Sequence, residues 1–218
     1  MKKYAARLVL ALLLPLVFIP AQAAEEFDEG FQYVRVRTPV EPVGNDAEGK
    51  IEVVELFWYG CGHCYSFEPH LQQWLQHKPD NVEFVRIPAI FNSGAWRLHA
   101  RAYYTAEALG VVDKIHGAFF DAIHKDNQPL NNLQQITRFF AKHGVDKKAF
   151  QQAFNSFAVD MKVKRAEQLT ERYGIDGVPA IVVAGKYRTD GPMAQSYKGM
   201  LQVTNHLLLQ EQRLASKR

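Results

Sequence analysis

The residues best suited to chemistry are two cysteines, the only two in the chain, which lie in the tetrad Cys61-Gly62-His63-Cys64. Upstream, residues 52–59 form an apolar run rich in valine and aromatic residues, which predicts a buried strand. Downstream, apolar residues recur at helical spacing as far as Lys78-Pro79, which predicts a helix. We therefore expect Cys61 at the exposed N-terminus of a helix and Cys64 one turn inside it, shielded from solvent.

A thiolate at a helix N-terminus is stabilised by free backbone N–H groups and by the positive end of the helix dipole. A protonated or hydrogen-bonding His63 would add to this effect. Stabilising the thiolate stabilises the reduced dithiol, so the Cys61-Cys64 disulfide becomes a stronger oxidant, by roughly 30 mV for each 1.4 kcal/mol.

Three other roles of the tetrad have less support from the sequence. A zinc site would need two further ligands, and no paired histidine motif completes the set. Covalent haem attachment requires a histidine directly after the second cysteine, where this chain has Tyr65. A purely structural disulfide would close a loop of only four residues and so would remove little chain entropy. The pattern therefore favours redox catalysis.

The chain begins with features of an export signal. Lys2, Lys3 and Arg7 precede an apolar stretch from Leu8 to Ile19, and small residues follow at 21–23. This stretch is too short to span a bilayer, which takes about 20 apolar residues. We expect residues 1–23 to be a cleaved signal peptide and the mature protein to be an exported, soluble monomer.

The charge balance argues against a nucleic-acid partner. The whole chain has 26 basic and 23 acidic residues, and residues 1–23 hold three basic side chains and no acidic ones, so the mature chain has equal numbers of both. No basic stripe with interleaved aromatic residues is present. In an exported protein, two cysteines spaced as CxxC favour a working redox pair over a disulfide scaffold.

The remaining pattern predicts an α/β domain with a helical insertion. Strand-like alternation occurs at residues 31–36 and 82–87, and the helix between residues 61 and 78 fits a parallel βαβ unit. Apolar stripes between Leu98 and Tyr173 predict five helices. A hairpin at 178–188, turning at Ala184-Gly185, and a helix at 194–214 follow. We assign 24–91 and 167–218 to the sheet domain and 92–166 to the insertion.

The segment ELFWYGCGHCYSFE at 55–68, together with GVPA at 177–180 and the helical block between them, resembles the DsbA family of periplasmic thiol:disulfide oxidoreductases. The resemblance covers essentially the whole mature chain. It implies a thioredoxin-like fold with an inserted all-helical domain. It also implies that Cys61 is the nucleophilic cysteine, that Cys64 is its buried partner, and that His63 stabilises the Cys61 thiolate. Gly62 departs from the proline common in the family; Gly-His is the pair that eukaryotic disulfide isomerases carry.

Two further sites follow from the resemblance. Glu55 lies in an apolar strand, where burial would raise its pKa and suit it to proton exchange with Cys64, the role of the family's buried acid. The alternative is a glutamate that is exposed or paired with a basic residue such as Arg86. The resemblance also implies that Pro179 is cis and faces the cysteines, and that the backbone of Val178 pairs with an extended substrate.

The sequence thus predicts an exported enzyme that donates its disulfide to newly exported or unfolded cysteine-containing proteins through a mixed disulfide at Cys61. It needs no cofactor, and the resemblance implies re-oxidation by a membrane quinone-linked partner of the DsbB type. Two alternatives stay open: an isomerase or reductase on the same scaffold, and a non-enzymatic peptide-binding chaperone. The remaining histidines are expected at the surface or at helix ends without a chemical role: His70, His77, His99, His116, His124, His143 and His206.

Overall fold

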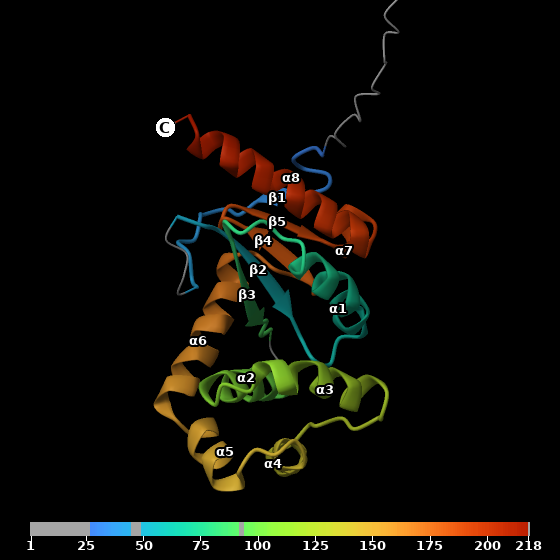
Figure 1. The fold of residues 1–218 in the computed structure, drawn as a ribbon, viewed down its shortest axis with the longest axis vertical. Coiled ribbons are helices and arrows are strands. Elements are labelled where there is room, and N and C mark those ends of the chain that lie inside the picture. Colours follow the sequence, from blue (N-terminus) through green and yellow to red (C-terminus); the bar gives the residue numbers. More distant parts are fainter. Residues whose placement is uncertain (1–26, 45–48, 92–93, 218) are drawn as a thin grey trace, which may run out of the picture.

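The computed structural model describes residues 27–44, 49–91 and 94–217, so the predicted signal peptide at residues 1–23 lies outside the described residues. These residues form a five-stranded sheet in the order β1-β5-β4-β2-β3 (Figure 1). The strands are β1 (Val34–Arg35), β2 (Ile51–Phe57), β3 (Val82–Pro88), β4 (Ala180–Val183) and β5 (Tyr187–Asp190). Only β2 and β3 run parallel among these pairings.

The inner strand β2 is buried from its second residue to its last, because it pairs on both sides and apolar side chains from the helices pack against both of its faces. Helix α1 (Gly62–Leu75) connects β2 to β3, which confirms the predicted βαβ unit. Apolar residues of α1 and of helix α8 (Tyr197–Ala215) pack together over one face of the sheet. The cysteine tetrad therefore begins four residues after the end of a buried inner strand.

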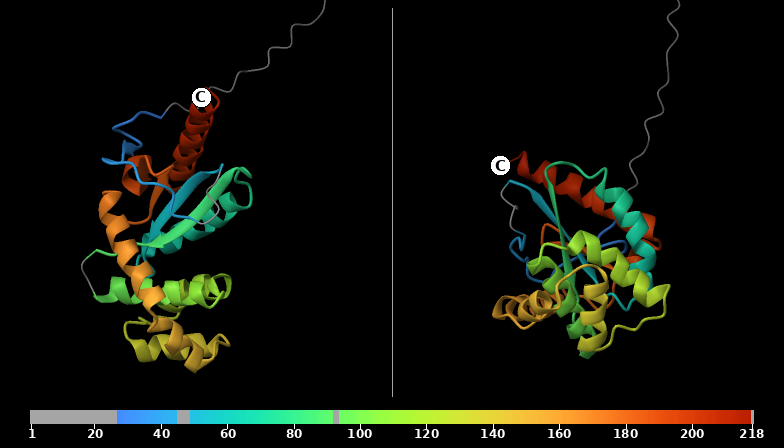
Figure 2. Two further views of the ribbon diagram at one scale, coloured as in Figure 1. Left: turned by 90° about the vertical axis from the view of Figure 1, so that its left-hand side faces the viewer. Right: turned by 60° about the horizontal axis from the view of Figure 1, so that its bottom comes forward.

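The helical block has the helices that the apolar stripes predict. These are α2 (Gly94–Ala108), α3 (Val112–His124), α4 (Leu133–Lys142), α5 (Lys147–Phe154) and α6 (Phe157–Arg172). Figure 1 and Figure 2 show α2 to α5 gathered beyond the end of the sheet at which β2 points, with α6 running back toward the strands. The side chains of Asn132, Asp146 and Ser156 cap α4, α5 and α6 by accepting a backbone N–H three residues on.

One buried apolar cluster joins the helical block to the sheet. It includes Val54, Leu56 and Phe57 of β2 together with residues of the helical block such as Phe119 and Phe140. Helix α6 continues without a break past residue 166. Within the described ranges, no helix combines the length and the apolar character that a membrane crossing requires.

Two elements differ from the sequence prediction in extent. The alternating run at residues 31–36 forms a strand over only Val34–Arg35, paired with β5 at the edge of the sheet. The helix expected at 194–214 is α8, which begins three residues later than predicted because Gln195 is left-handed at φ 60° and the Ser196 side chain caps the helix; Ala194 belongs instead to a separate short helix, α7 (Gly191–Ala194). The predicted hairpin turn is confirmed: Ala184 and Gly185 both have positive φ, as a type I′ turn requires.

Candidate active site

The structure places the two cysteines as their spacing predicts. Cys61 is the N-cap residue of α1 and is partly exposed, whereas Cys64 lies in the first turn and is completely buried. Both are free thiols. The first turn of α1 contains no acidic residue that would oppose a negative charge on Cys61. An attacking group can therefore reach Cys61, while Cys64 is reached only through it.

The two thiols differ strongly in acidity. A hydrogen bond from the Cys64 thiol, the backbone N–H groups of Cys64 and His63, and the positive charge available to His63 lower the pKa of Cys61 to about 6, against the opposing effect of partial burial. Burial raises the pKa of Cys64 well above its ordinary value, and the neighbouring Cys61 adds to this. The reduced pair therefore carries its negative charge on the outer sulfur at neutral pH.

A loop from the far end of the chain faces the tetrad. The Val178–Pro179 peptide bond is cis, as the resemblance implies, and the Cys61 thiol donates to the Val178 carbonyl oxygen at 3.3 Å. Pro179 and Val178 line a groove of about 860 Å³ that continues along α7 and reaches His63. The groove is mainly apolar where Pro192, Met193 and Tyr197 form its wall.

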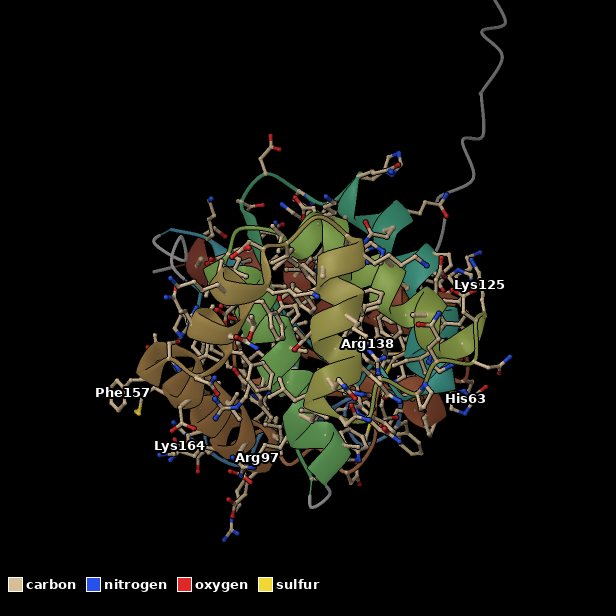
Figure 3. The ribbon with its side chains drawn as sticks, turned by 90° about the horizontal axis from the view of Figure 1, so that it is seen from below. His63, Arg97, Lys125, Arg138, Phe157 and Lys164 are labelled. Carbon is tan, nitrogen blue, oxygen red and sulfur yellow. The ribbon has the colours of Figure 1, made fainter. Side chains whose placement is uncertain are left out.

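His63 lies at the edge of this groove with its side chain exposed, pointing away from the body of the protein (Figure 3). Its Nδ1 atom is 3.1 Å from the hydroxyl of Tyr197 at the start of α8. The sequence pattern singles out His63 but not Tyr197, because 134 residues separate the two.

Glu55 is buried, as the proton-exchange role requires, and it is also paired with Arg86, as the alternative interpretation proposed. Its side chain is 1 % exposed, and Arg86 Nε donates to it at 2.9 Å. A second nitrogen of Arg86 donates to Glu68 at 2.8 Å. Burial raises the pKa of Glu55 to about 8 in spite of the Arg86 charge. For Glu68, burial is outweighed by His116, whose Nε2 lies 3.5 Å from the carboxylate, and by the charge of Arg86, which together hold its pKa at about 2.

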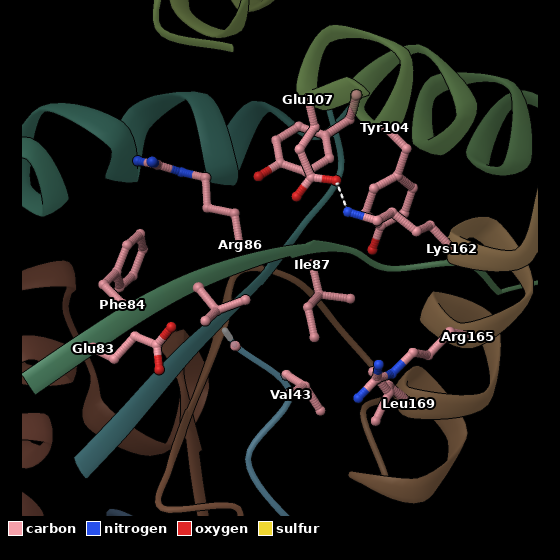
Figure 4. Close-up of a pocket in the computed structure, with 13 residues that line it drawn as sticks. Val43, Glu83, Phe84, Arg86, Ile87, Tyr104, Glu107, Lys162, Arg165 and Leu169 are labelled. Carbon is pink, nitrogen blue, oxygen red and sulfur yellow. Dashed lines mark hydrogen bonds and ion pairs between the residues drawn. The ribbon is translucent and has the colours of Figure 1, made fainter. Parts of the chain in front are cut away.

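Arg86 also lines a separate cavity of about 300 Å³ between β3, α2 and α6 (Figure 4). An ion pair between Glu107 and Lys162 crosses this cavity. The side chain of Arg86 is 13 % exposed, while that of Glu55 is almost completely enclosed. Arg86 therefore separates Glu55 from the solvent on the side of this cavity.

The expectation that the remaining histidines lie at the surface or at helix ends is wrong for His99 and His116, which are buried in the helical block. His116 Nδ1 lies 3.0 Å from the Tyr59 hydroxyl, and the side chain of His124 donates to the Tyr59 carbonyl oxygen at 2.8 Å. Helix α3 thus holds the segment that precedes the cysteines. The four-residue spacing of His116, Phe120 and His124 is the sequence signal that could have revealed this face.

Aromatic contacts fix the residues on either side of the tetrad. The Trp58 indole is stacked on Trp96 of α2, with ring centroids 4.1 Å apart and an interplanar angle of 16°. Tyr65, directly after Cys64, is stacked on His124 and donates its hydroxyl to Asp121 of α3 at 2.9 Å. The helical block therefore contacts the chain immediately before and immediately after the redox pair.

Comparison with known proteins agrees with this geometry. The model of the DSBA-like thioredoxin domain family matches residues 52–202. The thiol:disulfide interchange protein DsbA of Azotobacter vinelandii is 48 % identical over 182 residues, 84 % of this chain and 83 % of the relative. DsbA of Pseudomonas aeruginosa strain PAO1 is 41 % identical over 201 residues, 92 % and 93 % of the two chains.

Solved structures give the same result. A crystal structure of Pseudomonas aeruginosa DsbA has a TM-score of 0.81 and 40 % identity, and covers 88 % of this chain and 97 % of its own. A Proteus mirabilis DsbA variant with a non-covalently bound peptide has a TM-score of 0.71 and 29 % identity, and covers 84 % and 99 %. The chain therefore belongs to the DsbA family of thiol:disulfide oxidoreductases, and Cys61-Cys64 is its redox pair.

Proposed function

We propose that this protein oxidises pairs of cysteines in newly exported proteins by donating its Cys61-Cys64 disulfide. The single observation that carries this proposal is the difference in acidity between the two thiols, with the pKa of Cys61 at about 6 and that of Cys64 far above its ordinary range. A disulfide whose reduced form is stabilised in this way is a strong oxidant of other thiols.

The transfer takes two displacement steps. A client thiolate attacks Cys61 Sγ, the Cys61–Cys64 bond breaks, and its electron pair goes to Cys64, which takes up a proton. A second client thiolate then attacks the client sulfur of the mixed disulfide, and Cys61 leaves as a thiolate. The client loses two electrons and two protons and gains a disulfide. Cys64 takes up one of these protons and the other goes to solvent, so the reduced enzyme holds a Cys64 thiol and a Cys61 thiolate. The low pKa of Cys61 makes it a good leaving group.

We infer that Glu55 supplies the proton that Cys64 requires in the first step. Cys64 is completely buried, so bulk water does not reach it directly. With its pKa raised to about 8, Glu55 is protonated at neutral pH and can give up a proton near that pH. The charge on Glu55 also acts on Cys64, since an ionised Glu55 raises the pKa of that thiol further.

We infer that clients dock as extended segments along Val178 and Pro179. Main-chain hydrogen bonds of this kind accept many side-chain sequences, which suits an enzyme with varied clients. The contact between the Cys61 thiol and the Val178 carbonyl supports the proposed site, and the apolar groove beside it gives room for client side chains. The peptide carried by the Proteus mirabilis relative is consistent with such docking.

The proposed setting follows the sequence and the family. The protein would be exported by residues 1–23, act in the periplasm as a monomer without nucleic acid or added cofactor, and be re-oxidised by a membrane quinone-linked protein of the DsbB type. We also infer that residues 92–166 are an insertion into a thioredoxin-like domain formed by 24–91 and 167–218. The second junction of that insertion lies within α6 rather than in a linker.

Equilibration of the purified protein with glutathione buffers tests the direction of transfer. We expect an oxidising reduction potential, close to the reference value of about −120 mV for DsbA. We take this value from the reference protein and do not derive it from the structure. A potential near that of thioredoxin, about −270 mV, would overturn the proposal.

Trapping tests the mechanism. A Cys64→Ala variant should accumulate mixed disulfides with client proteins at Cys61, and dithiothreitol should release them. A Cys61→Ala variant is the matched control and should trap none. Complexes that persist after reduction would instead indicate the non-enzymatic chaperone.

A second candidate function is disulfide isomerisation, favoured by Gly62 between the two cysteines. It predicts a less oxidising potential, near the value of about −180 mV given for protein disulfide isomerase. It also predicts efficient rescue of a scrambled substrate by the reduced protein. The glutathione equilibration described above separates the two functions.

A further inference from the structure

Tyr197 contacts the one side chain between the two cysteines that can carry charge. Its hydroxyl lies 3.1 Å from Nδ1 of His63, although it belongs to the C-terminal helix α8. Tyr197 also lines the groove beside Pro179. The contact therefore joins α8, the groove and the first turn of α1.

The phenol ring of Tyr197 is held in place by packing. Its centroid is 5.7 Å from the ring of Phe67, which is completely buried, and 5.7 Å from the ring of His70. The hydroxyl of Ser196 caps α8 by accepting from the Gly199 N–H at 2.9 Å, which fixes the helix start. His63, Phe67 and His70 follow one face of α1 by their spacing, and Tyr197 lies along this face.

The side chain of His63, by contrast, is exposed, and its Nδ1 atom contacts the Tyr197 hydroxyl. A cationic imidazole stabilises the Cys61 thiolate only while it stays near the sulfur. The fixed hydroxyl of Tyr197 can accept a hydrogen bond from the Nδ1–H of the imidazolium. Asp176 and Asp190, the acidic residues that line the same groove, have other partners, namely Arg188 and the backbone N–H of Met193.

We propose that Tyr197 is a positioning residue for thiol–disulfide exchange, whose hydroxyl holds the His63 imidazole beside Cys61 and so favours the reduced form of the pair. The inference rests on the proposed function, because it assigns Tyr197 a part in making the disulfide oxidising. It also places this restraint on the surface that an extended client would contact.

The test is Tyr197→Phe, which keeps the ring and its packing and removes only the hydroxyl. We expect the ratio of thiolate to thiol at Cys61 to fall about threefold at a given pH, measured by thiolate absorbance near 240 nm across a pH titration. We also expect the reduction potential to fall by about 15 mV, the same threefold change at 29.6 mV for each factor of ten. Circular dichroism should be unchanged.

Two controls separate positioning from a general structural effect. In a His63→Ala background, Tyr197→Phe should produce no further change, because the effect acts through the imidazole. Tyr187→Phe removes another hydroxyl, which accepts a hydrogen bond from Gln210 on the far part of α8. That variant should change stability and leave the thiolate fraction and the potential as in the wild type.

The inference is overturned if Tyr197→Phe has the wild-type thiolate fraction and potential, or if its effect persists without His63. Failure of the proposed function looks different, because the wild type itself would then have a reducing potential. The thiolate titration would still test Tyr197, since it does not depend on the direction of electron flow.

Discussion

The acidity of Cys61 sets the pH at which the reduced protein becomes reactive. Its pKa of about 6 lies below the ordinary thiol value of 9.0. We predict that the alkylation rate of the reduced protein by iodoacetamide rises with pH with a midpoint near 6, since only the thiolate reacts. Cys64→Ala should keep one reactive thiol, whereas Cys61→Ala should react slowly across this range. A midpoint near 9 would contradict the assignment.

The same pKa makes the stability of the reduced protein depend on pH. Folding lowers the pKa of Cys61, so its contribution to stability is complete above the unfolded value of 9.0 and is lost as pH falls through about 6. The disulfide form lacks this titration. The reduced form should therefore gain stability over the oxidised form as pH rises from 6 to 9, as urea unfolding of both forms would show.

Glu55 titrates in the opposite sense. Its folded pKa of about 8 lies above the ordinary 4.5, so its contribution is complete below 4.5 and is lost as pH rises through 8. Glu55→Gln cannot ionise, so we predict a smaller loss of stability than in the wild type between pH 5 and pH 8.5, measured by urea unfolding. Client oxidation should be slower in this variant. Wild-type kinetics would refute the proton-transfer role.

Gly62 occupies the first helical position of α1, where proline is well tolerated. A Cβ atom at this position would meet no other atom within 4 Å. The backbone donors that lower the pKa of Cys61 belong to His63 and Cys64, so the missing N–H of a proline costs nothing there. We predict that Gly62→Pro raises stability by about 0.4–1 kcal/mol, because it restricts the unfolded chain. Thermal unfolding would measure it, and a loss of stability would contradict it.

At the residue scale, the sequence identified groups whose setting is local and missed those whose setting is not. Cys61 and Cys64 could be placed because the strand before them and the helix after them are adjacent in the chain. Glu55 could be placed in a strand and paired with Arg86, but the sequence did not show that Arg86 also binds Glu68, because that contact depends on how α1 packs. Tyr197 was not singled out as a partner of His63 because the pairing requires α8 to lie against α1.

Helix α3 is the element that fixes the approach to the cysteines. His124 donates to the Tyr59 carbonyl and its ring is stacked on Tyr65. We predict that His124→Phe keeps the stacking, leaves the carbonyl without its donor, and lowers stability by about 1 kcal/mol. Urea unfolding would measure the loss. A variant as stable as the wild type would show that solvent replaces the histidine.

Among elements, those with a clear apolar period were predicted, whereas the short extent of β1 and the separate helix α7 were not. Strand β2 and the helices of the insertion have strong periodic patterns, and the structure contains them. The short strand β1 depends on pairing with β5, which is far away in sequence. The break between α7 and α8 depends on a left-handed Gln195, a conformation that glutamine rarely adopts and that no local pattern indicates.

For the whole molecule, one apolar cluster spans the sheet and the helical block, so the two should unfold together. The sequence predicted an insertion, but it could not show that the insertion supplies buried histidines to the segment before the cysteines. Those contacts arise from packing between parts that lie far apart in the chain. The helical block therefore supports the redox pair as well as covering it.

The stacked indoles of Trp58 and Trp96 belong to these two parts, one directly after β2 and the other in α2. Two chromophores this close exchange excitation, so their ultraviolet transitions should split into a pair of circular dichroism bands of opposite sign. We predict that this couplet disappears in Trp96→Phe and, in the wild type, at the same urea concentration as the helical signal. An earlier disappearance would mean that the helical block detaches first. The couplet would therefore report, without any added label, whether the helical block is packed against the sheet.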